Sequence, residues 1–316
     1  MAEQSKTISP EHEYLGAGKS AAYGLQHVLT MYGGIIAPPL IVGTAVGLDA
    51  YQIGLLIAAA LFVGGLATIL QTIGVKYVGA KLPLVQGVSF AGVATMVAIV
   101  TTGGGLSAVY GAVIIASLMG FLLAPYFSKI IRFFPPVVTG CVITVIGLSL
   151  LPVAIRWMMG GNSKAPEWGS IENIGLALMT LGLVICLNLT RNPAIRRLSI
   201  LLAIVLGSIL AYILGFGDFS IVANGAWVQV PSFFAFGLPT FELTAIISML
   251  IVTLVIMTET TADIIAVGEI VGTKVDSERI SNGLRADMLS SAVAPIFGSF
   301  MQSAFAQNVG LVAITG

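Results

Sequence analysis

The sequence predicts an all-α polytopic membrane protein. Of its 316 residues, 57% are hydrophobic and 9% are charged, whereas soluble domains carry roughly 25% charged residues. Apolar stretches of about 20 residues, the length that a helix needs to cross a bilayer, follow one another along most of the chain. The fourteen basic and fourteen acidic residues cancel, so the net charge gives no argument for a nucleic-acid partner.

The polar segment 1–20 is expected to be a cytoplasmic tail. It lacks the basic start followed directly by a short apolar core that a cleavable signal peptide needs, so the first apolar stretch is predicted to be a true membrane span. Cys141 and Cys186 lie in separate apolar segments. They show neither metal-ligand spacing nor a disulfide framework and are expected to be packing residues.

Nine complete spans and the start of a tenth are predicted. Pro38 and Pro39 should break or end the first helix. The tenth span begins near residue 303. The nine complete spans are expected at 21–45, 52–73, 85–102, 106–126, 135–155, 173–189, 198–216, 242–268 and 283–299.

The basic residues support this topology. With a cytoplasmic N-terminus, the outer loops hold only Arg156 and Lys164, and the other twelve basic residues lie inside. This is the asymmetry that membrane proteins show. The inside set is Lys6, Lys19, Lys76, Lys81, Lys129, Arg132, Arg191, Arg196, Arg197, Lys274, Arg279 and Arg285.

Two segments are unusual for membrane helices. Residues 82–92 read LPLVQGVSFAG and residues 303–310 read SAFAQNVG, with a short echo between SFA at 89–91 and AFA at 304–306. Interrupted apolar segments in corresponding halves of a transporter indicate a binding site built from broken helices. The alternative is that Gly and Pro are simply common in membrane helices.

Buried ionisable residues are costly in a membrane and mark candidate functional sites. Glu259 and Asp263 lie four residues apart, on one face of a helix. Both cannot stay ionised cheaply in a low dielectric, so at least one is expected to carry a proton. The alternative is a structural pair that donors from a neighbouring helix satisfy.

Asp287 and His27 are less clear candidates. Asp287 stands near the start of the ninth span, beside Arg285, and could be a functional carboxylate, an interfacial ion pair or a helix-start carboxylate. His27 is the only histidine within a span and follows Gln26. It fits a structural role as well as proton or substrate handling.

The adjacent amides Gln307 and Asn308 offer hydrogen-bond donors and acceptors. Such groups suit a planar ligand with alternating C=O and N–H edges, and Glu259 could accept from ring N–H groups of that ligand. Hydrogen bonding between helices is the alternative. No nucleophile arrangement, metal motif or phosphate loop occurs in the sequence, which favours solute recognition over catalysis.

Several stretches together resemble the nucleobase–ascorbate transporters, or nucleobase:cation symporter-2 family. QNVGLVAITG at 307–316 matches the family signature, and LQHVLTMYGGIIAPPLIVG at 25–43 is similar to its first helix. The remaining similar stretches are FPPVVTGCVITVIGLSL at 134–150, ETTADIIAVGEIVG at 259–272 and GLRADM at 283–288. They occur in the family's order.

The resemblance implies a fold of two inverted seven-helix repeats, divided into a core and a gate domain, with short strands in segments three and ten. Transported solute would bind between those strands. The core would take 21–126 and 241–316, and the gate would take 127–240. Such proteins are usually homodimers, and a proton or a sodium ion drives their transport; no other cofactor and no metal is expected.

The resemblance also assigns roles to residues. Glu259 and Gln307 would hydrogen-bond the base, while Phe90 and Ala306 in the paired strands, with the adjacent Ser89, would contribute backbone groups and packing. The supporting residues would be Asp263, Asp287, His27 and Asn308. Thr315 and Gly316 would influence specificity.

Two departures limit the assignment. Val309 is typical of uric acid carriers, whereas Gly316 is typical of xanthine carriers, so the sequence does not choose between these purines. The family has fourteen segments and this sequence stops within the tenth. We therefore expect that this chain alone does not transport.

The leading hypothesis is proton-coupled symport of xanthine or uric acid across the plasma (inner) membrane by a multi-pass protein with a cytoplasmic N-terminus. A carrier of uracil or another solute on the same fold is the first alternative. An inorganic-anion carrier is disfavoured because no Lys or Arg lies at mid-membrane. A membrane enzyme or receptor is the second alternative.

Overall fold

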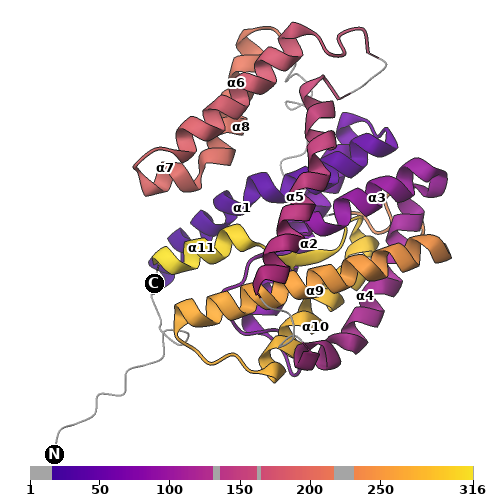
Figure 1. Ribbon diagram of the computed structural model, residues 1–316, viewed down its shortest axis with the longest axis vertical. Helices are drawn as coiled ribbons and strands as arrows, with labels where there is room; N and C mark the ends of the chain where they lie inside the picture. Colours follow the sequence, from indigo (N-terminus) through magenta and orange to yellow (C-terminus); the bar gives the residue numbers. More distant parts are fainter. Residues whose placement is uncertain (1–15, 131–135, 162–164, 217–230, 316) are drawn as a thin grey trace, which may run out of the picture.

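The structure is a computed structural model that describes residues 16–130, 136–161, 165–216 and 231–315 (Figure 1). It is mainly helical. Within the described residues, five helices are long and apolar enough to cross a membrane. The helices are α1 (Ala17–Val46), α2 (Ala50–Ile73), α3 (Val93–Ile99), α4 (Gly105–Ile130), α5 (Pro136–Met158), α6 (Ile171–Asn188), α7 (Pro193–Arg197), α8 (Ser199–Ile213), α9 (Leu243–Val271), α10 (Ser277–Val293) and α11 (Ala306–Thr315).

The first helix contradicts one expectation. α1 continues through Pro38 and Pro39 to its C-cap at Gly47. Each proline removes a backbone donor, so two carbonyl groups one turn earlier lose their partners within the helix. Neighbouring helices help membrane helices to tolerate such losses, and both prolines are buried.

The third predicted span contains a strand and then turns back. β1 (Gln86–Val88) leads through a 3-10 turn, Phe90–Gly92, into α3. A π-helical turn then ends at Gly104, and Gly103 within it has a φ of 103°. This left-handed conformation favours glycine, and it separates α3 from α4 at the boundary that the sequence predicts.

The predicted strands in segments three and ten are present. β1 pairs antiparallel with β2 (Gln302–Ala304), and Gly87 lies opposite Ser303. However, the placement of Phe90 and Ala306 in these strands is wrong. Phe90 begins the 3-10 turn after β1, and Ala306 begins α11 after β2, because each strand is only three residues long.

The ninth predicted span, 283–299, is shifted. α10 begins six residues earlier, at Ser277, where the Asp276 side chain accepts the N–H of Arg279 and caps the helix. The helix ends at Val293, and a 3-10 turn, Ala294–Phe297, follows it. The first turn of α10 is polar, so a prediction based on apolar stretches does not include it.

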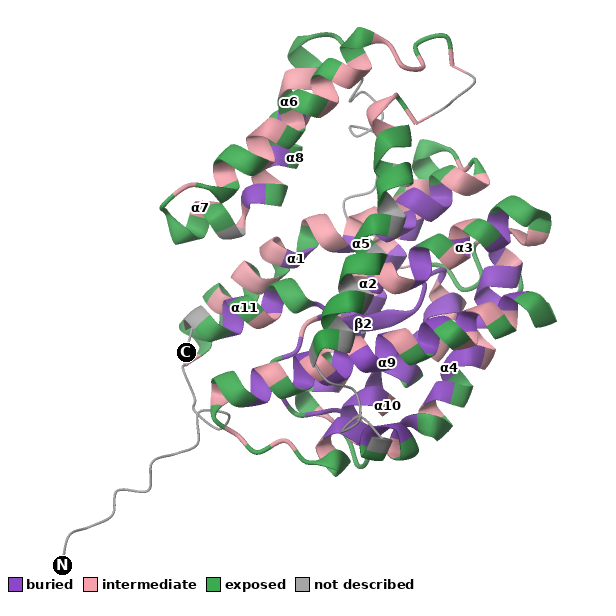
Figure 2. Ribbon diagram, in the orientation of Figure 1, coloured by how far each residue is buried: buried purple, intermediate pink, exposed green. Residues whose placement is uncertain are grey.

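The helices form two groups (Figure 1). α6, α7 and α8 contact one another and form a group at one side of the bundle that holds the strands. α8 contacts α1 of that bundle, and α5 contacts both α6 and α9. Burial follows this grouping: α2, α4, α9 and α10 bury their inner faces, whereas α6 has no buried residue (Figure 2). The predicted division into core and gate domains stays a prediction.

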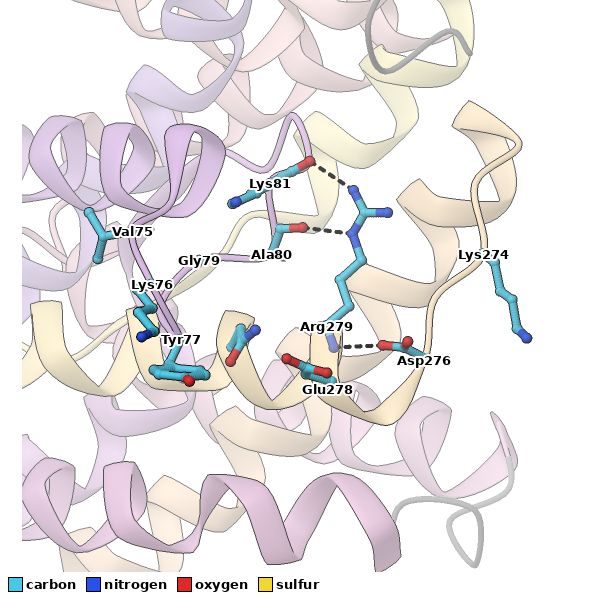
Figure 3. Close-up of a pocket in the computed structure, with 11 residues that line it drawn as sticks. Val75, Lys76, Tyr77, Gly79, Ala80, Lys81, Lys274, Asp276, Glu278 and Arg279 are labelled. Carbon is cyan, nitrogen blue, oxygen red and sulfur yellow. Dashed lines mark hydrogen bonds between the residues drawn. The ribbon is translucent and has the colours of Figure 1, made fainter.

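The loop after α2 is fixed to α10 by Arg279 (Figure 3). Its guanidinium donates from Nε to the Ala80 carbonyl at 2.7 Å and from Nη2 to the Lys81 carbonyl at 2.9 Å. The N–H of Gly79 in turn donates to the Asn282 carbonyl at 2.7 Å. These bonds join a loop and a helix that lie about 200 positions apart in the sequence.

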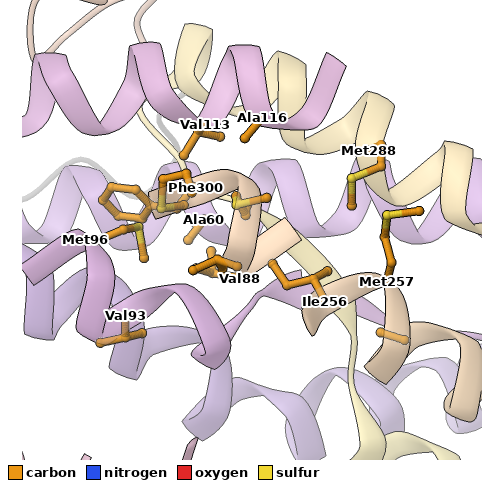
Figure 4. Packing of buried hydrophobic residues seen from close by; sticks show 14 of the residues in the cluster. Ala60, Val88, Val93, Met96, Val113, Ala116, Ile256, Met257, Met288 and Phe300 are labelled. Carbon is orange, nitrogen blue, oxygen red and sulfur yellow. The ribbon is translucent and has the colours of Figure 1, made fainter. Parts of the chain in front are cut away.

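The core of the bundle surrounds the strands (Figure 4). Val88 of β1 is fully buried, and so are Ile256 and Met257 of α9 and Phe300 just before β2. Tyr110 of α4 stacks on Phe300 with 5.8 Å between ring centroids. The two short strands are thus packed mainly by α2 on the side of β1 and by α9 and α10 on the side of β2.

Candidate functional site

The paired strands have an approximate two-fold arrangement centred on Gly87 and Ser303. The N–H of Ser89 donates to Met301 at 2.8 Å, and the N–H of Phe305 donates to Val85 at 2.9 Å. A shift of 216 residues exchanges these two bonds and maps each strand onto the other. Interrupted segments from two parts of the chain, paired in this way, are what inverted repeats place at a transporter's binding site.

The bounds of the elements also correct the echo seen in the sequence. The match of SFA at 89–91 with AFA at 304–306 implies a shift of 215 residues, whereas the two strands and the starts of the helical segments after them, Phe90 and Ala306, differ by 216. Phe90 therefore corresponds to Ala306, and Ser89 corresponds to Phe305. The first residue of the helical turn is the equivalent point in both halves.

A helix N-terminus follows each strand. The turn Phe90–Gly92 leads into α3, and α11 starts at Ala306. The first N–H groups of a helix have no partner within it and carry a partial positive charge. On the α3 side, the Ser89 hydroxyl accepts one of these groups, the N–H of Ala91, at 3.2 Å. Such N–H groups suit the carbonyl oxygens of a ligand.

Phe305 holds α1 against the strands. Its ring is buried and lies over Gly87 of β1 and Gly34 of α1. A Cβ on Gly34 would lie 2.7 Å from the ring, and a Cβ on Gly87 would overlap it. The side-chain amide of Gln307 also reaches Gly34. The glycines therefore allow a close approach that positions Gln307 beside α1.

Glu259 lies on α9 at the end of β2. The next residue, Thr260, accepts the N–H of Ala304 at 3.4 Å, which places this turn of α9 against the strand. Glu259 is half-buried, and its Oε2 is buried without a hydrogen-bond partner; the same holds for Oδ2 of the buried Asp263. These two oxygens, Glu259 Oε2 and Asp263 Oδ2, therefore do not accept the hydrogen bonds from a described neighbouring helix that a purely structural pair would require.

Asp287 is the centre of a buried hydrogen-bond network. Its Oδ2 accepts from the Thr260 hydroxyl, and its Oδ1 accepts from Gln71 Nε2 at 3.2 Å. Gln71 also donates to the Gly283 carbonyl and accepts the N–H of Ala80. Asp287 is fully buried within α10, so it is neither a helix-start carboxylate nor an interfacial ion pair. It joins α2, α9 and α10.

His27 and Asn308 come together as a pair. Asn308 Nδ2 lies 3.0 Å from His27 Nδ1 and donates to the His27 carbonyl at 3.0 Å. These bonds join α1 to the first turn of α11. Asn308 Oδ1 is buried without a partner, so the amide keeps one free acceptor. The pair thus supports the position of Gln307 in the same turn.

A cavity of about 310 Å³ lies beside His27. It is bounded by α1, α2 and the segment 83–85, and Thr68 and Leu84 contribute to its mostly apolar lining. Neither Glu259 nor Gln307 lines it. The cavity therefore lacks the two side chains that are predicted to hydrogen-bond the base.

The remaining predicted residues are Ala306, Phe90, Thr315 and Gly316. Ala306 is exposed at the start of α11, and Phe90 is half-buried in its turn, which contacts α9. Thr315 is the last residue of α11. Gly316 lies outside the described residues.

Three residues of the site were missed at the level of sequence. Thr260 and Gln71 bind Asp287, and Phe305 fixes the strand to α1. The sequence offers two signals for these partners of Asp287: Thr260 is a polar residue next to Glu259, and Gln71 is an isolated glutamine in an apolar helix. Nothing in the sequence predicts that Phe305 lies between two glycines, because the three segments are distant along the chain.

Comparison with known proteins gives a family match over most of the chain. Residues 18–316 match the family model Xan_ur_permease, described as "Permease family". The chain is 42% identical to the uric acid permease PucK of Bacillus subtilis, with 92% of this chain and 67% of the relative covered. It is 40% identical to the xanthine permease of B. subtilis, with 95% and 68% covered.

A third relative is the uric acid transporter UacT of Escherichia coli, which is 37% identical, with 99% of this chain and 65% of the relative covered. The chain spans about two thirds of the length of these relatives.

Solved structures show the same fold. The transmembrane domain of the cyanobacterial bicarbonate transporter BicA aligns with a TM-score of 0.62 at 19% identity, covering 92% of this chain and 77% of that one. SLC26A9 aligns with a TM-score of 0.55 at 11% identity, covering 93% and 51%. The predicted transporter fold is confirmed, although likeness at this identity does not indicate which solute is bound.

Proposed function

Because the chain belongs to the xanthine and uric acid permease family, nucleobase:cation symporter-2, we propose that it binds xanthine or uric acid for secondary-active transport. It is a multi-pass membrane protein of a permease family rather than an enzyme. The proposal takes its substrate class from the names of the relatives and from the chemistry of the strand ends.

The observation that carries the proposal is Glu259. It has a buried, unpartnered carboxylate oxygen on the turn of α9 that touches β2, next to the start of α11. A purine dione or trione has N–H groups that a carboxylate accepts and carbonyl groups that helix N–H groups can bind. Gln307, beside Gly34, adds both a donor and an acceptor.

Coupling to an ion forms the second part of the proposal. Three carboxylates, Glu259, Asp263 and Asp287, lie near one another at membrane depth, and no described lysine or arginine forms an ion pair with them. Such a group is costly unless it takes up protons or a cation. We favour a proton, with sodium as the alternative, as the driving ion for movement of the strand-bearing bundle.

The proposal places the protein in the plasma (inner) membrane with its N-terminus in the cytoplasm. Twelve basic residues on that side against two on the other support the orientation. We also propose a homodimer as the working assembly. Exposed apolar side chains on α5, α6 and α8 leave ample surface for lipid and for a second copy.

Binding tests the substrate class. The purified protein should bind labelled xanthine or uric acid in equilibrium dialysis, and chromatography of the bound fraction should recover the solute unchanged. Uracil and bicarbonate serve as comparison solutes. Binding of uracil or bicarbonate without either purine would contradict the proposal, as would chemical conversion of the purine by the purified protein.

A further inference from the structure

A polar pocket lies where α2 ends and α10 begins (Figure 3). Its volume is about 450 Å³, and it is lined by the loop 74–81 and by residues around the start of α10. Lys76, Lys81, Lys274 and Arg279 contribute four positive charges, against two from Asp276 and Glu278. The pocket is therefore cationic overall.

The three lysines of this pocket are not neutralised by the structure. Among the described residues, no carboxylate pairs with Lys76, Lys81 or Lys274; the only recorded contact of these ammonium groups is Lys76 Nζ above the Tyr77 ring, at 5.2 Å. The Asp276 side chain instead accepts a hydrogen bond from the backbone N–H of Arg279, at 2.8 Å. The ammonium groups thus remain available to an anion.

The loop that carries two of these lysines is rigidly held. Arg279 binds the carbonyls of Ala80 and Lys81, and the N–H of Lys81 donates to the Gln71 carbonyl at 3.0 Å. Lys81 has a φ of 54°, a conformation that non-glycine residues rarely adopt. These bonds hold Lys81 at the pocket in spite of that unfavourable backbone, as a pre-formed binding site requires.

The surroundings favour a membrane lipid over a soluble anion. Ile73, Val75 and Tyr77 expose 70%, 57% and 56% of their surface next to the lysines. Apolar and tyrosine side chains beside lysines are typical of the membrane interface. The pocket also holds a buried acceptor without a partner, Asn282 Oδ1, together with Glu278, and both suit hydroxyl groups.

We propose that this pocket binds the headgroup of an anionic phospholipid with free hydroxyls, such as phosphatidylglycerol, from the cytoplasmic leaflet. The lysines bind the phosphate, and Asn282 and Glu278 accept from the glycerol hydroxyls. Basic pockets between membrane helices suit anionic lipids in this way. The choice of leaflet rests on the orientation proposed above, whereas the binding itself is independent of purine transport.

Lipid binding to the purified chain tests the inference without any purine. Native mass spectrometry would compare phosphatidylglycerol with phosphatidylcholine for the wild type and for the triple variant Lys76→Gln, Lys81→Gln, Lys274→Gln. The matched control, Lys19→Gln, Lys129→Gln, Arg191→Gln, removes the same charge from exposed positions outside the pocket. Circular dichroism and size exclusion verify folding, and a Lys→Arg triple variant at the pocket tests rescue.

The wild type should prefer phosphatidylglycerol, and the pocket variant should bind it about 10- to 100-fold more weakly, since each basic residue near an anionic surface contributes a several-fold effect. The control and the Lys→Arg variant should bind nearly as the wild type does. Equal weakening in the pocket variant and the control would overturn the proposal. Displacement of the lipid by millimolar inorganic phosphate would overturn the choice of a lipid. Neither result bears on the proposed purine binding.

Discussion

Asp287 has a role that its position in the sequence does not indicate. A carboxylate beside an arginine near a predicted helix start suggests an ion pair, yet the structure surrounds Asp287 with the neutral donors Thr260 and Gln71. Both partners reach further, Thr260 to the N–H of Ala304 and Gln71 to the N–H of Ala80. One side chain therefore ties the strand, α9, α10 and the loop after α2 together.

Asp287→Ala should destabilise the protein because it leaves two buried donors, on Gln71 and Thr260, without their acceptor. Each buried unpaired group costs about 1–3 kcal/mol. The thermal midpoint of the purified chain in detergent checks this, with Glu278→Ala, an exposed acidic position on the same helix, as control. Equal midpoints for the two variants would show that the network contributes no stability.

At the scale of elements, the strands depend on a close contact with α2. A Cβ on Gly64 would lie 2.8 Å from the Ile35 side chain and 3.0 Å from the Gln86 carbonyl oxygen, whereas nothing lies within 4 Å of a Cβ on Gly65. The two adjacent glycines thus differ sharply. Only Gly64 lets α2 approach β1.

Gly64→Ala should lower stability by about 1–3 kcal/mol, because overpacking displaces the strand or α1. Gly65→Ala on the same helix should be neutral or slightly stabilising, since alanine favours a helix over glycine. Thermal unfolding of both variants provides the comparison. The close contact between α2 and β1 would be refuted by a Gly64→Ala protein as stable as Gly65→Ala.

The sequence predicted the elements better than their contacts. Apolar length placed the helices, and the family resemblance implied the strands in the interrupted segments around Gln86 and Gln307. The prediction that Pro38 and Pro39 break α1 is wrong. The sequence shows the local free-energy cost of a proline in a helix but not the tertiary packing that offsets it. The Thr260–Asp287 bond and the Phe305 ring between two glycines could not be predicted, since they join distant segments.

At the scale of the whole molecule, the fold and the solute are separate questions. The same architecture occurs in a bicarbonate transporter and in SLC26A9, at identities of 19% and 11%, so the fold alone does not choose a ligand. What distinguishes this chain lies at the strand ends, where Glu259, Gln307 and the start of α11 bring together a carboxylate, an amide and helix N–H groups. These groups suit a purine better than an inorganic anion. An anion would need a basic partner, and no described Lys or Arg lies beside these groups.

The most direct test of the central claim is equilibrium binding of xanthine and uric acid to the purified chain. The measurement compares Glu259→Gln with Glu269→Gln. Both residues lie on α9, but Glu259 has a buried free oxygen whereas Glu269 is exposed. Glu259→Gln should weaken purine binding about 10- to 100-fold, the value of a hydrogen bond to a charged group, and Glu269→Gln should bind as the wild type does. Unchanged purine affinity in Glu259→Gln would contradict the proposed site.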